Sequence, residues 1–545
     1  MSVFFSLPSV LRIDYSIKRS GDFGITKLGG VAVLNIHRLI YRSPDVAWDA
    51  ITSHLLTIIC LPFAPQAIRV QAARVLDEIL LIVPRNLNNT GELQAQVQRR
   101  VLEALAQQVV PDPTVSSHQQ TSTSVELRRM GLETLHQILQ TSGHTLVVGW
   151  EIIFQMLESV CRPTSTTSIS APVQLPMHTS VDSLTGPPSP VTKMKLLPLG
   201  LGIPTEKSYS GLVKIAFQSL TLVCDSVSSL SPEHLRLCIS TLGQFGRQAD
   251  TNIALTAAAS LLWSVSDVIQ SKRKNVDEEP KYSELWMFLL LEVLGLCADS
   301  RAEVRDGAIQ TLFRTMQLYG ATLSSETWDQ CIWKVTFPLL ESLTKEIRQL
   351  TDPNHDHDPA IDQTWDDSKI LALNSIGSIF TDFLVSKIML LDSFTKAWNV
   401  FVGNIEEAML IDHRIISSPA LRCLEKAIKA AATAEGVLRL RVVEVLERVW
   451  QAIDLIGSSA TRRYNSQVDL EKAPHQPLTQ ESLVAFVDVI QNMRKTSRSM
   501  DGKEWDLSRL TRLMAILKGA YGSYNFFLSW LLDLLLRRSH IPTLI

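Results

Sequence analysis

The stretch from Ser283 to Gly320 limits the fold of this chain more than any other. Its first part, residues 285–297, carries apolar side chains on almost every side, so a helix formed there must be buried on several faces. Ser283 stands just before it and has the hydroxyl expected of a helix N-cap. After a short polar turn, a second helix places apolar residues every three or four positions: Val304, Ala308, Ile309, Leu312, Phe313 and Met316. The stretch predicts two helices joined by a tight turn, with Arg305 and its polar neighbours mostly off the apolar stripe.

The turn between these two helices resembles the inter-helix turn of a HEAT repeat. Asp299 stands at the end of the first helix, and Arg305 stands in the first turn of the second, with Val304 before it and Ala308 after it. An aspartate and an arginine at these positions can pair along a stack of repeats, and the small or branched residues let neighbouring helices approach. We therefore expect Asp299, Val304, Arg305 and Ala308 to form a structural HEAT turn.

The same helix-pair pattern occurs elsewhere in the chain. Arg69 takes the position of Arg305 in the amphipathic stretch of residues 68–84, and Arg128 and Arg129 lie near the start of another such helix. Alternating apolar runs typical of strands are scarce. Helix pairs that recur and pack on their neighbours form a solenoid. The predicted fold class is all-α: an α-solenoid of HEAT/armadillo-like helix pairs with disordered inserted loops.

Polar, turn-rich segments divide the predicted array. We expect N-terminal HEAT-like helices in residues 1–161, a disordered Ser/Thr/Pro-rich insertion in residues 162–208, a central HEAT-like array in residues 209–456, a loop in residues 457–481, and C-terminal helices, open to truncation, in residues 482–545. Ser189 precedes Pro190 within the insertion and is a candidate phosphorylation site for a proline-directed kinase. A plain spacer is the alternative reading of that insertion.

Composition describes a folded protein without a strong charge bias. The chain of 545 residues is too long for one core, and 46% of it is hydrophobic against 20% charged. A net charge of −3 gives no general attraction for nucleic acid or anionic lipid. The 7 cysteines are scattered without a CxxC pair, which indicates buried thiols in a reducing cytosol. No uninterrupted apolar run reaches the roughly 18–20 residues that a membrane span needs.

Motifs that carry chemistry are weak throughout, so we predict no catalytic, cofactor-binding or metal-binding residues. None of the familiar phosphate-cradle, nucleophile-elbow or zinc-protease motifs occurs. His355 to Asp358 has metal-ligand chemistry, but the segment is rich in turn residues and predicts a solvated acidic loop. The tryptophans in apolar helical patterns predict core packing in place of base stacking: Trp263, Trp286, Trp328, Trp333 and Trp398.

Two C-terminal segments leave alternatives open. The basic run Arg494 to Arg498 follows an apolar helix and predicts either a solvated helix end or a patch for anionic lipid. The apolar tail Tyr524 to Arg538 is interrupted by Asp533. It fits an interfacial helix, the last helix of the array without its partner, or the product of an incomplete gene structure.

Four sequence blocks, taken together and in order, resemble the Mon-two family. Its members are large relatives of the Arf guanine-nucleotide-exchange factors that lack the catalytic Sec-seven domain. The blocks are residues 125–150, residues 211–226 with 252–267, residues 285–335, and residues 369–380 with 394–408. The resemblance implies the middle-to-C-terminal HEAT region of such a protein. Because family members are far longer, it also implies that the chain is a fragment.

The resemblance further implies a cytoplasmic scaffold without enzymatic activity, peripheral on Golgi, trans-Golgi-network and endosome membranes. Such a scaffold would serve vesicle-mediated protein transport between Golgi, endosomes and vacuole. Its implied partners are a Dopey-family protein, a phospholipid flippase and an Arf-like GTPase, with no nucleic acid and with homo-oligomerisation left open. One alternative is a direct regulator or effector of Arf-family GTPases, and another is a nuclear-transport-like HEAT receptor, which shares the architecture.

Overall fold

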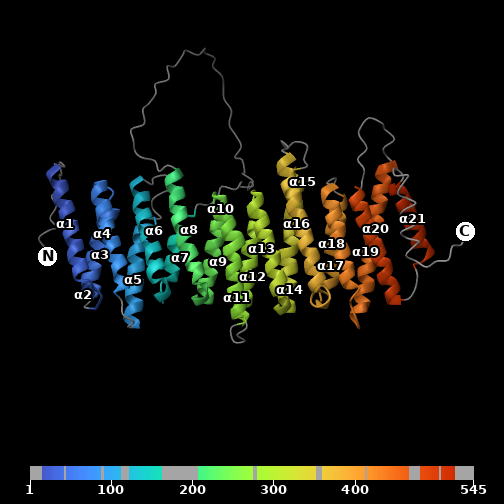
Figure 1. Ribbon diagram of the computed structural model, residues 1–545, viewed down its shortest axis with the longest axis horizontal. Coiled ribbons are helices and arrows are strands. Elements are labelled where there is room, and N and C mark those ends of the chain that lie inside the picture. Colours follow the sequence, from blue (N-terminus) through green and yellow to red (C-terminus); the bar gives the residue numbers. More distant parts are fainter. Residues whose placement is uncertain are drawn as a thin grey trace, which may run out of the picture. The chain divides into compact units, whose positions relative to one another are not determined.

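The computed structural model describes residues 15–41, 44–86, 91–111, 122–161, 206–273, 279–350, 359–410, 414–465, 479–501 and 505–521. Every regular element within these ranges is a helix (Figure 1). The chain divides into two compact units, Met1–Ile253 and Ala254–Ile545. This division falls inside the array of residues 209–456 that the sequence suggested. The all-α solenoid class predicted from the sequence is confirmed.

The first unit is built from helices of one to six turns. They are α1 (Tyr15–Leu34), α2 (Ile36–Tyr41), α3 (Pro44–Cys60), α4 (Gln66–Arg85), α5 (Glu92–Val109), α6 (Ser122–Ser142), α7 (Trp150–Glu158), α8 (Glu206–Asp225) and α9 (Pro232–Gly246), with the short turns η3 (Gly143–Thr145) and η4 (Val227–Ser229). α10 (Thr251–Leu255) contains the boundary between the units.

Two rows of helices make up this first unit. One row runs through α1, α4, α6 and α8, each packed on the next, and the other runs through α3, α5, α7 and α9. α3 packs on α4, α5 on α6 and α7 on α8, so each pair contributes one helix to each row. The apolar stripes of both rows meet between the rows, as Leu76, Leu105 and Leu135 show by being completely buried.

The second unit repeats this arrangement with longer helices. Its elements are η5 (Thr256–Leu261), α11 (Leu262–Lys272), α12 (Glu279–Leu296), α13 (Ala302–Tyr319), η7 (Gly320–Thr322), α14 (Ser325–Gln330), η8 (Cys331–Thr336), α15 (Phe337–Leu350), α16 (Pro359–Phe383), η9 (Ile388–Leu390), α17 (Phe394–Leu410), α18 (Arg414–Ala431), α19 (Leu438–Asn465), α20 (Gln480–Asp501) and α21 (Leu507–Tyr521). α13, α16, α18 and α20 pack in one row, and α15, α17, α19 and α21 in the other.

Two segments described in the second unit, η5 and η8, have π geometry, and η8 lies next to a proline. α14, η8 and α15 are continuous, and η8 has the wider π geometry. Pro338 lies just after η8 and has no N–H to donate to the preceding turn, while its ring would clash with the carbonyl four residues back. A single π-turn relieves that clash, and Thr336 Oγ1 donates to the Cys331 carbonyl at 3.1 Å.

Helix starts agree with the sequence in one case and differ in another. Ser231 caps α9, accepting a hydrogen bond from the His234 amide at 3.3 Å, with Pro232 in the first helical position. Ser283 does not cap α12, because the helix begins earlier, at Glu279, and Ser283 lies inside it. The expected N-cap at Ser283 is therefore wrong. Pro280 fits the first turn of a helix, where no N–H is needed, so α12 can begin four residues before Ser283.

Three segments expected to be loops or helix ends are partly helical. α19 continues to Asn465 although a loop was expected over residues 457–481. α16 begins at Pro359, inside the acidic, turn-rich stretch of residues 351–367 that was expected to be a loop. The basic run from Arg494 to Arg498 lies within the C-terminal end of α20, whose last turn contains Arg498, and does not follow the helix. The array resumes after the insertion at Glu206, three residues before the expected boundary.

One helical stretch among the described residues has the length and apolar composition of a membrane span. It runs from Thr251 to Lys272, and half of its most apolar window is buried within the protein. The sequence missed it because its apolar residues are interspersed with serine and threonine. Residues of η5 and α11 pack on α12 and α13, as those of a core helix do.

Most of the cysteines lie in the core, as expected. Cys224, Cys238, Cys297, Cys331 and Cys423 are buried and Cys161 is half-buried. Cys60, the last residue of α3, is exposed, which corrects the prediction that all seven thiols are buried. Helical periodicity does not define an inward face at the end of a helix, where the chain turns away.

Candidate functional site

Arg305 connects the turn between α12 and α13 to the next helix of its row, α16. Its Nη1 donates to the Asp299 carbonyl at 2.8 Å, its Nη2 to the Thr364 carbonyl at 3.0 Å, and its Nε to Ser368 Oγ at 2.7 Å. The side chain is completely buried. Its position corrects the expectation that Arg305 lies off the buried stripe: the guanidinium is buried because its donors find acceptors both in the turn and on α16.

The buried charge of Arg305 is balanced by a hydroxyl relay and an aromatic ring. The Ser368 hydroxyl, which accepts from Arg305, donates in turn to Asp306 Oδ1 at 2.5 Å. The guanidinium carbon lies 3.8 Å from the centre of the Trp365 ring, within range of a cation–π interaction. Burial lowers the pKa of Arg305, and the nearby charge of Asp306 raises it. An arginine remains charged at physiological pH all the same.

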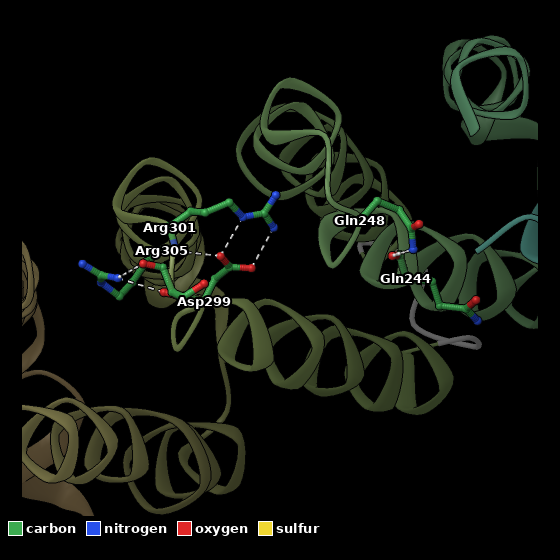
Figure 2. A network of polar contacts seen from close by, with 6 residues as sticks. Gln244, Gln248, Asp299, Arg301 and Arg305 are labelled. Atoms are coloured by element: carbon green, nitrogen blue, oxygen red, sulfur yellow. Dashed lines mark hydrogen bonds and ion pairs between the residues drawn. The ribbon is translucent and has the colours of Figure 1, made fainter. Parts of the chain in front are cut away.

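The carboxylate of Asp299 pairs with Arg301, two residues along. Oδ1 accepts from the Arg301 amide and from its Nε, both at 2.9 Å, and Oδ2 accepts from its Nη2 at 2.9 Å. Figure 2 shows Arg301 and Arg305 reaching the turn from opposite sides. Burial raises the pKa of Asp299, but the hydrogen bonds from Arg301 outweigh it and lower that pKa below its usual value. The expected pairing of Asp299 with Arg305 is therefore corrected: Arg305 binds the carbonyl of Asp299, not its carboxylate.

The carbonyl contact, in contrast, recurs in the first unit. Arg69, in the first turn of α4, donates through Nε to the Ile59 carbonyl at the end of α3, at 2.7 Å. Arg128 on α6 donates to the Val109 carbonyl at the end of α5, at 2.8 Å, and also to the Ser159 carbonyl at 3.0 Å. The last carbonyls of a helix lack intrahelical donors and carry partial negative charge. An arginine at this position donates hydrogen bonds to these carbonyls and so holds the two helices of a pair together.

The small and branched residues of α13 allow close helix packing around this turn. Val304 and Ala308 are completely buried. A Cβ at Gly307 would lie only 2.7 Å from Leu255 Cδ1, so the glycine permits a close approach that alanine would obstruct. This turn is structural: its polar groups are engaged with each other, and they hold helices in place.

A surface hollow of about 610 Å³ lies between α15 and α17. Its lining is Phe337, Glu341, Thr344, Lys345, Arg348, Gln349, Val400, Asn404 and Glu407. Arg348 and Glu407 form an ion pair across it. Lys369 of α16 is buried nearby and donates to Thr344 Oγ1 at 2.8 Å, and burial lowers its pKa to about 8. The hollow has both signs of charge.

A second hollow, of about 380 Å³, lies between α4 and α6. Its lining is Val70, Arg74, Asp77, Glu78, Leu81, Glu126, Arg129, Met130, Glu133, Thr134 and Gln137. Arg129 donates to Glu126 through two nitrogens, at 2.9 and 2.6 Å, and pairs with Glu133 on its other side. Asp77 lies in this lining with only 8% of its surface exposed.

Several sequence-predicted positions lie elsewhere. Ser189, the segment from His355 to Asp358 and the tail from Tyr524 to Arg538 fall outside the described residues. Trp286, Trp328 and Trp398 are buried, as predicted for the core, whereas Trp263 and Trp333 are half-buried beneath Arg314 and Lys396. In the described ranges no group of three or more His, Cys, Asp or Glu side chains is placed to hold a metal ion.

The sequence did not identify three residues that hold this turn in place: Arg301 in the turn itself, and Trp365 and Ser368 on α16. Arg301 could have been found, since an aspartate two residues before an arginine at a helix start favours a local pair. Trp365 and Ser368 carry no such signal, because they lie about 60 residues further along the chain.

Rows of helix pairs, with arginines that bind the carbonyls at the end of the preceding helix or turn, define an α-solenoid of the HEAT/armadillo kind. The sequence profile for the C-terminal region of Mon2 protein matches residues 275–469, and the profile for the HDS region of Mon2/Sec7/BIG1-like proteins matches residues 114–175. Together with homologues from animals and fungi, these matches confirm the resemblance to the Mon2 (Mon-two) family that the sequence blocks predicted.

Curated relatives are distant in sequence and much longer. The Protein MON2 homolog of Drosophila melanogaster is 24% identical over 496 residues, which cover 84% of this chain and 26% of that protein. The human homolog is 23% identical over 453 residues, covering 76% and 22%. The ARF guanine-nucleotide exchange factor GNOM of Arabidopsis thaliana is 24% identical over 251 residues, covering 43% and 17%. The chain thus spans about a quarter of the length of the first of these relatives.

Among solved structures, a crystal structure of importin beta matches 93% of this chain and 58% of its own. The sequence identity is 12% and the TM-score 0.27.

Proposed function

We propose that this chain is part of a non-enzymatic scaffold for vesicle-mediated protein transport between Golgi, endosomes and vacuole. The observation that carries the proposal is the family match over residues 275–469, which covers α12 to α19 of the second unit. There the helices bury their apolar faces against neighbours and leave polar faces and a hollow of about 610 Å³ open to partners. A solenoid offers an extended surface of this kind.

The proposed partners are a Dopey-family protein, a phospholipid flippase and an Arf-like GTPase, on the cytoplasmic side of Golgi, trans-Golgi-network and endosome membranes. These partners are proposed from the resemblance to the Mon2 family alone. A binding assay with purified proteins tests the first: the full chain is immobilised and the Dopey-family protein is titrated over it. Saturable binding is expected, and it should survive Arg439→Met, a change at an exposed position. Absence of binding by a chain that remains folded contradicts this part of the proposal.

A second candidate function is direct regulation of Arf-family GTPases, favoured by the similarity to GNOM, whose name describes an ARF guanine-nucleotide exchange factor. Release of a fluorescent nucleotide from an Arf-like GTPase, with and without the full chain, separates the two. The scaffold predicts binding of the GTPase without faster release. A release rate that rises in proportion to the concentration of the chain establishes exchange activity and overturns the non-enzymatic proposal.

A further inference from the structure

The hollow between α4 and α6 contains a buried acid whose hydrogen bonds are incomplete. Asp77 projects from α4, and its Oδ1 has no hydrogen-bond donor among the described residues. A buried carboxylate oxygen without a donor is costly, because it loses its hydration without compensation. Rotation about the last side-chain bond can present either oxygen to the hollow, since that torsion is soft in aspartate.

The charges around Asp77 leave an acidic surplus. Glu78, Glu126 and Glu133 share the lining with Asp77, against Arg74 and Arg129. Arg129 is already engaged by Glu126 and Glu133 on its own helix. Two acids in the lining are thus left in excess of its bases, and Glu78 is exposed at the rim of the hollow.

We propose that the hollow between α4 and α6 binds a cationic side chain, arginine or lysine, presented by a peptide segment of a partner protein. Its guanidinium or ammonium group donates to the Asp77 carboxylate and lies within the field of Glu78 and Glu133. A guanidinium supplies the donor that Asp77 Oδ1 lacks, and charge-assisted bonds of this type are stronger than neutral ones. The apolar side chains Val70, Leu81 and Met130 line the same hollow and suit the methylene stem of either residue.

The competing explanation is a neutral Asp77. Gln108 Oε1 is also buried without a donor, and a protonated Asp77 could donate to it. Burial raises the pKa of Asp77 to about 7, so both forms are populated near neutrality. The two explanations differ in whether the hollow binds a ligand. A protonated Asp77 needs no bound cation, whereas an ionised Asp77 receives a hydrogen bond from one.

A pair of peptides tests the proposal on the full chain by fluorescence polarisation. The probe is a fluorescein-labelled nonapeptide with adjacent arginines at its centre among glycine and alanine. Its control replaces the arginines with citrulline, which has the same shape but no charge. We expect the arginine peptide to bind at least about tenfold more tightly than the citrulline peptide. Equal affinity of the two peptides overturns the proposal.

Variants of the chain locate the binding. Asp77→Asn should weaken binding of the arginine peptide about tenfold, and Arg74→Gln should strengthen it two- to threefold, roughly, by removing a like charge. The matched control is Glu103→Gln, an exposed acid on α5 outside the hollow, which should change nothing. An equal loss in Glu103→Gln would mean attraction by net charge alone and would overturn the site.

One further pair keeps the test decisive should Asp77→Asn fail to fold. Glu78→Lys reverses a charge at the exposed rim, and Glu103→Lys makes the same change on α5. The proposal predicts that only Glu78→Lys abolishes binding of the arginine peptide. Indistinguishable binding by these two variants overturns it. The inference goes beyond the proposed transport function and holds or fails independently of it.

Discussion

The guanidinium of Arg305 on α13 lies 3.8 Å from the ring centre of Trp365 on α16, and both side chains are buried. The two residues are 60 positions apart in the sequence and come from consecutive helices of one row. Their contact fixes the turn between α12 and α13 to the next helix pair. Arg305 thus binds the turn after α12 and also links two consecutive helix pairs.

Replacing Arg305 with methionine should lower the free energy of unfolding of the second unit by about 3 kcal/mol or more. The change leaves the carbonyls of Asp299 and Thr364 buried without this donor. Chemical denaturation of the full chain, followed by far-UV circular dichroism, measures it. Arg439→Met, at an exposed position in the same unit, is the control and should leave the transition where it is. Equal stability of the two variants would show that Arg305 does not hold consecutive helix pairs together.

Lysine in place of Arg305 should recover only part of the lost stability. An ammonium group is a compact point charge and cannot reach Asp299, Thr364 and Ser368 at once, as the guanidinium fork does. The transition of Arg305→Lys should therefore fall between those of wild type and Arg305→Met. A lysine variant as stable as wild type would mean that charge, not fork geometry, is what matters there.

Placing a charge on the apolar stripe of α13 should destabilise the second unit by several kcal/mol, on the order of 3–5. Val304→Asp and Ala308→Glu each bury an unpaired carboxylate, since both positions are completely buried. Gln310→Glu adds the same charge at an exposed position of the same helix and should be nearly neutral. Thermal melting of the three variants checks this. Unchanged melting of the two core variants would mean that α13 does not bury Val304 and Ala308 against its neighbours.

Asp77 should make the first unit less stable as pH rises. Its folded pKa of about 7 is above the ordinary 3.8, so the folded protein holds a proton that the unfolded chain has lost. Stability is therefore highest below pH 4, falls between pH 4 and pH 7, and levels off above, with a span of up to about 4 kcal/mol. Asp77→Asn lacks this titrating group. Its free energy of unfolding should therefore rise relative to that of wild type as the pH increases from 4 to 7. A constant difference from pH 4 to pH 8 would contradict the raised pKa.

Thiol labelling should follow burial. Cys60 is exposed and should react with a maleimide within minutes, about the rate of a free thiol, whereas Cys331 and Cys423 are buried and their pKa values are raised to about 12. Mass spectrometry of the folded protein should find the label at Cys60 and, only after denaturant is added, at the other two. Early labelling of Cys331 would mean that α14 and η8 open readily.

The sequence predicts what depends on local pattern. The buried stripe of α13 and the start of α9 at Ser231 follow from helical periodicity and capping chemistry. The recurrence of Arg69 and Arg128 at equivalent positions was visible as well, and each contacts the carbonyl at the end of the preceding helix.

What depends on distant neighbours could not be predicted. The expected loop starts at Gly457, yet α19 passes through this residue. A Cβ there would lie 2.2 Å from Ile516 Cγ2 on α21, so the position needs a glycine for packing. The glycine serves close packing of two helices. The pairing of the Asp299 carboxylate with Arg301, and not with Arg305, could not be predicted either. It depends on the acceptors that α16 provides for Arg305, which lie more than 50 residues away in the sequence.

A bridging titration tests the scaffold proposal most directly. A Dopey-family protein is fixed to beads, a labelled Arf-like GTPase is in solution, and the full chain is added in increasing amounts. A scaffold that binds both partners at once predicts retention of the GTPase that rises with added chain and then falls, when excess chain occupies each partner separately. Retention that does not depend on the chain, or no retention at any concentration, would contradict the account.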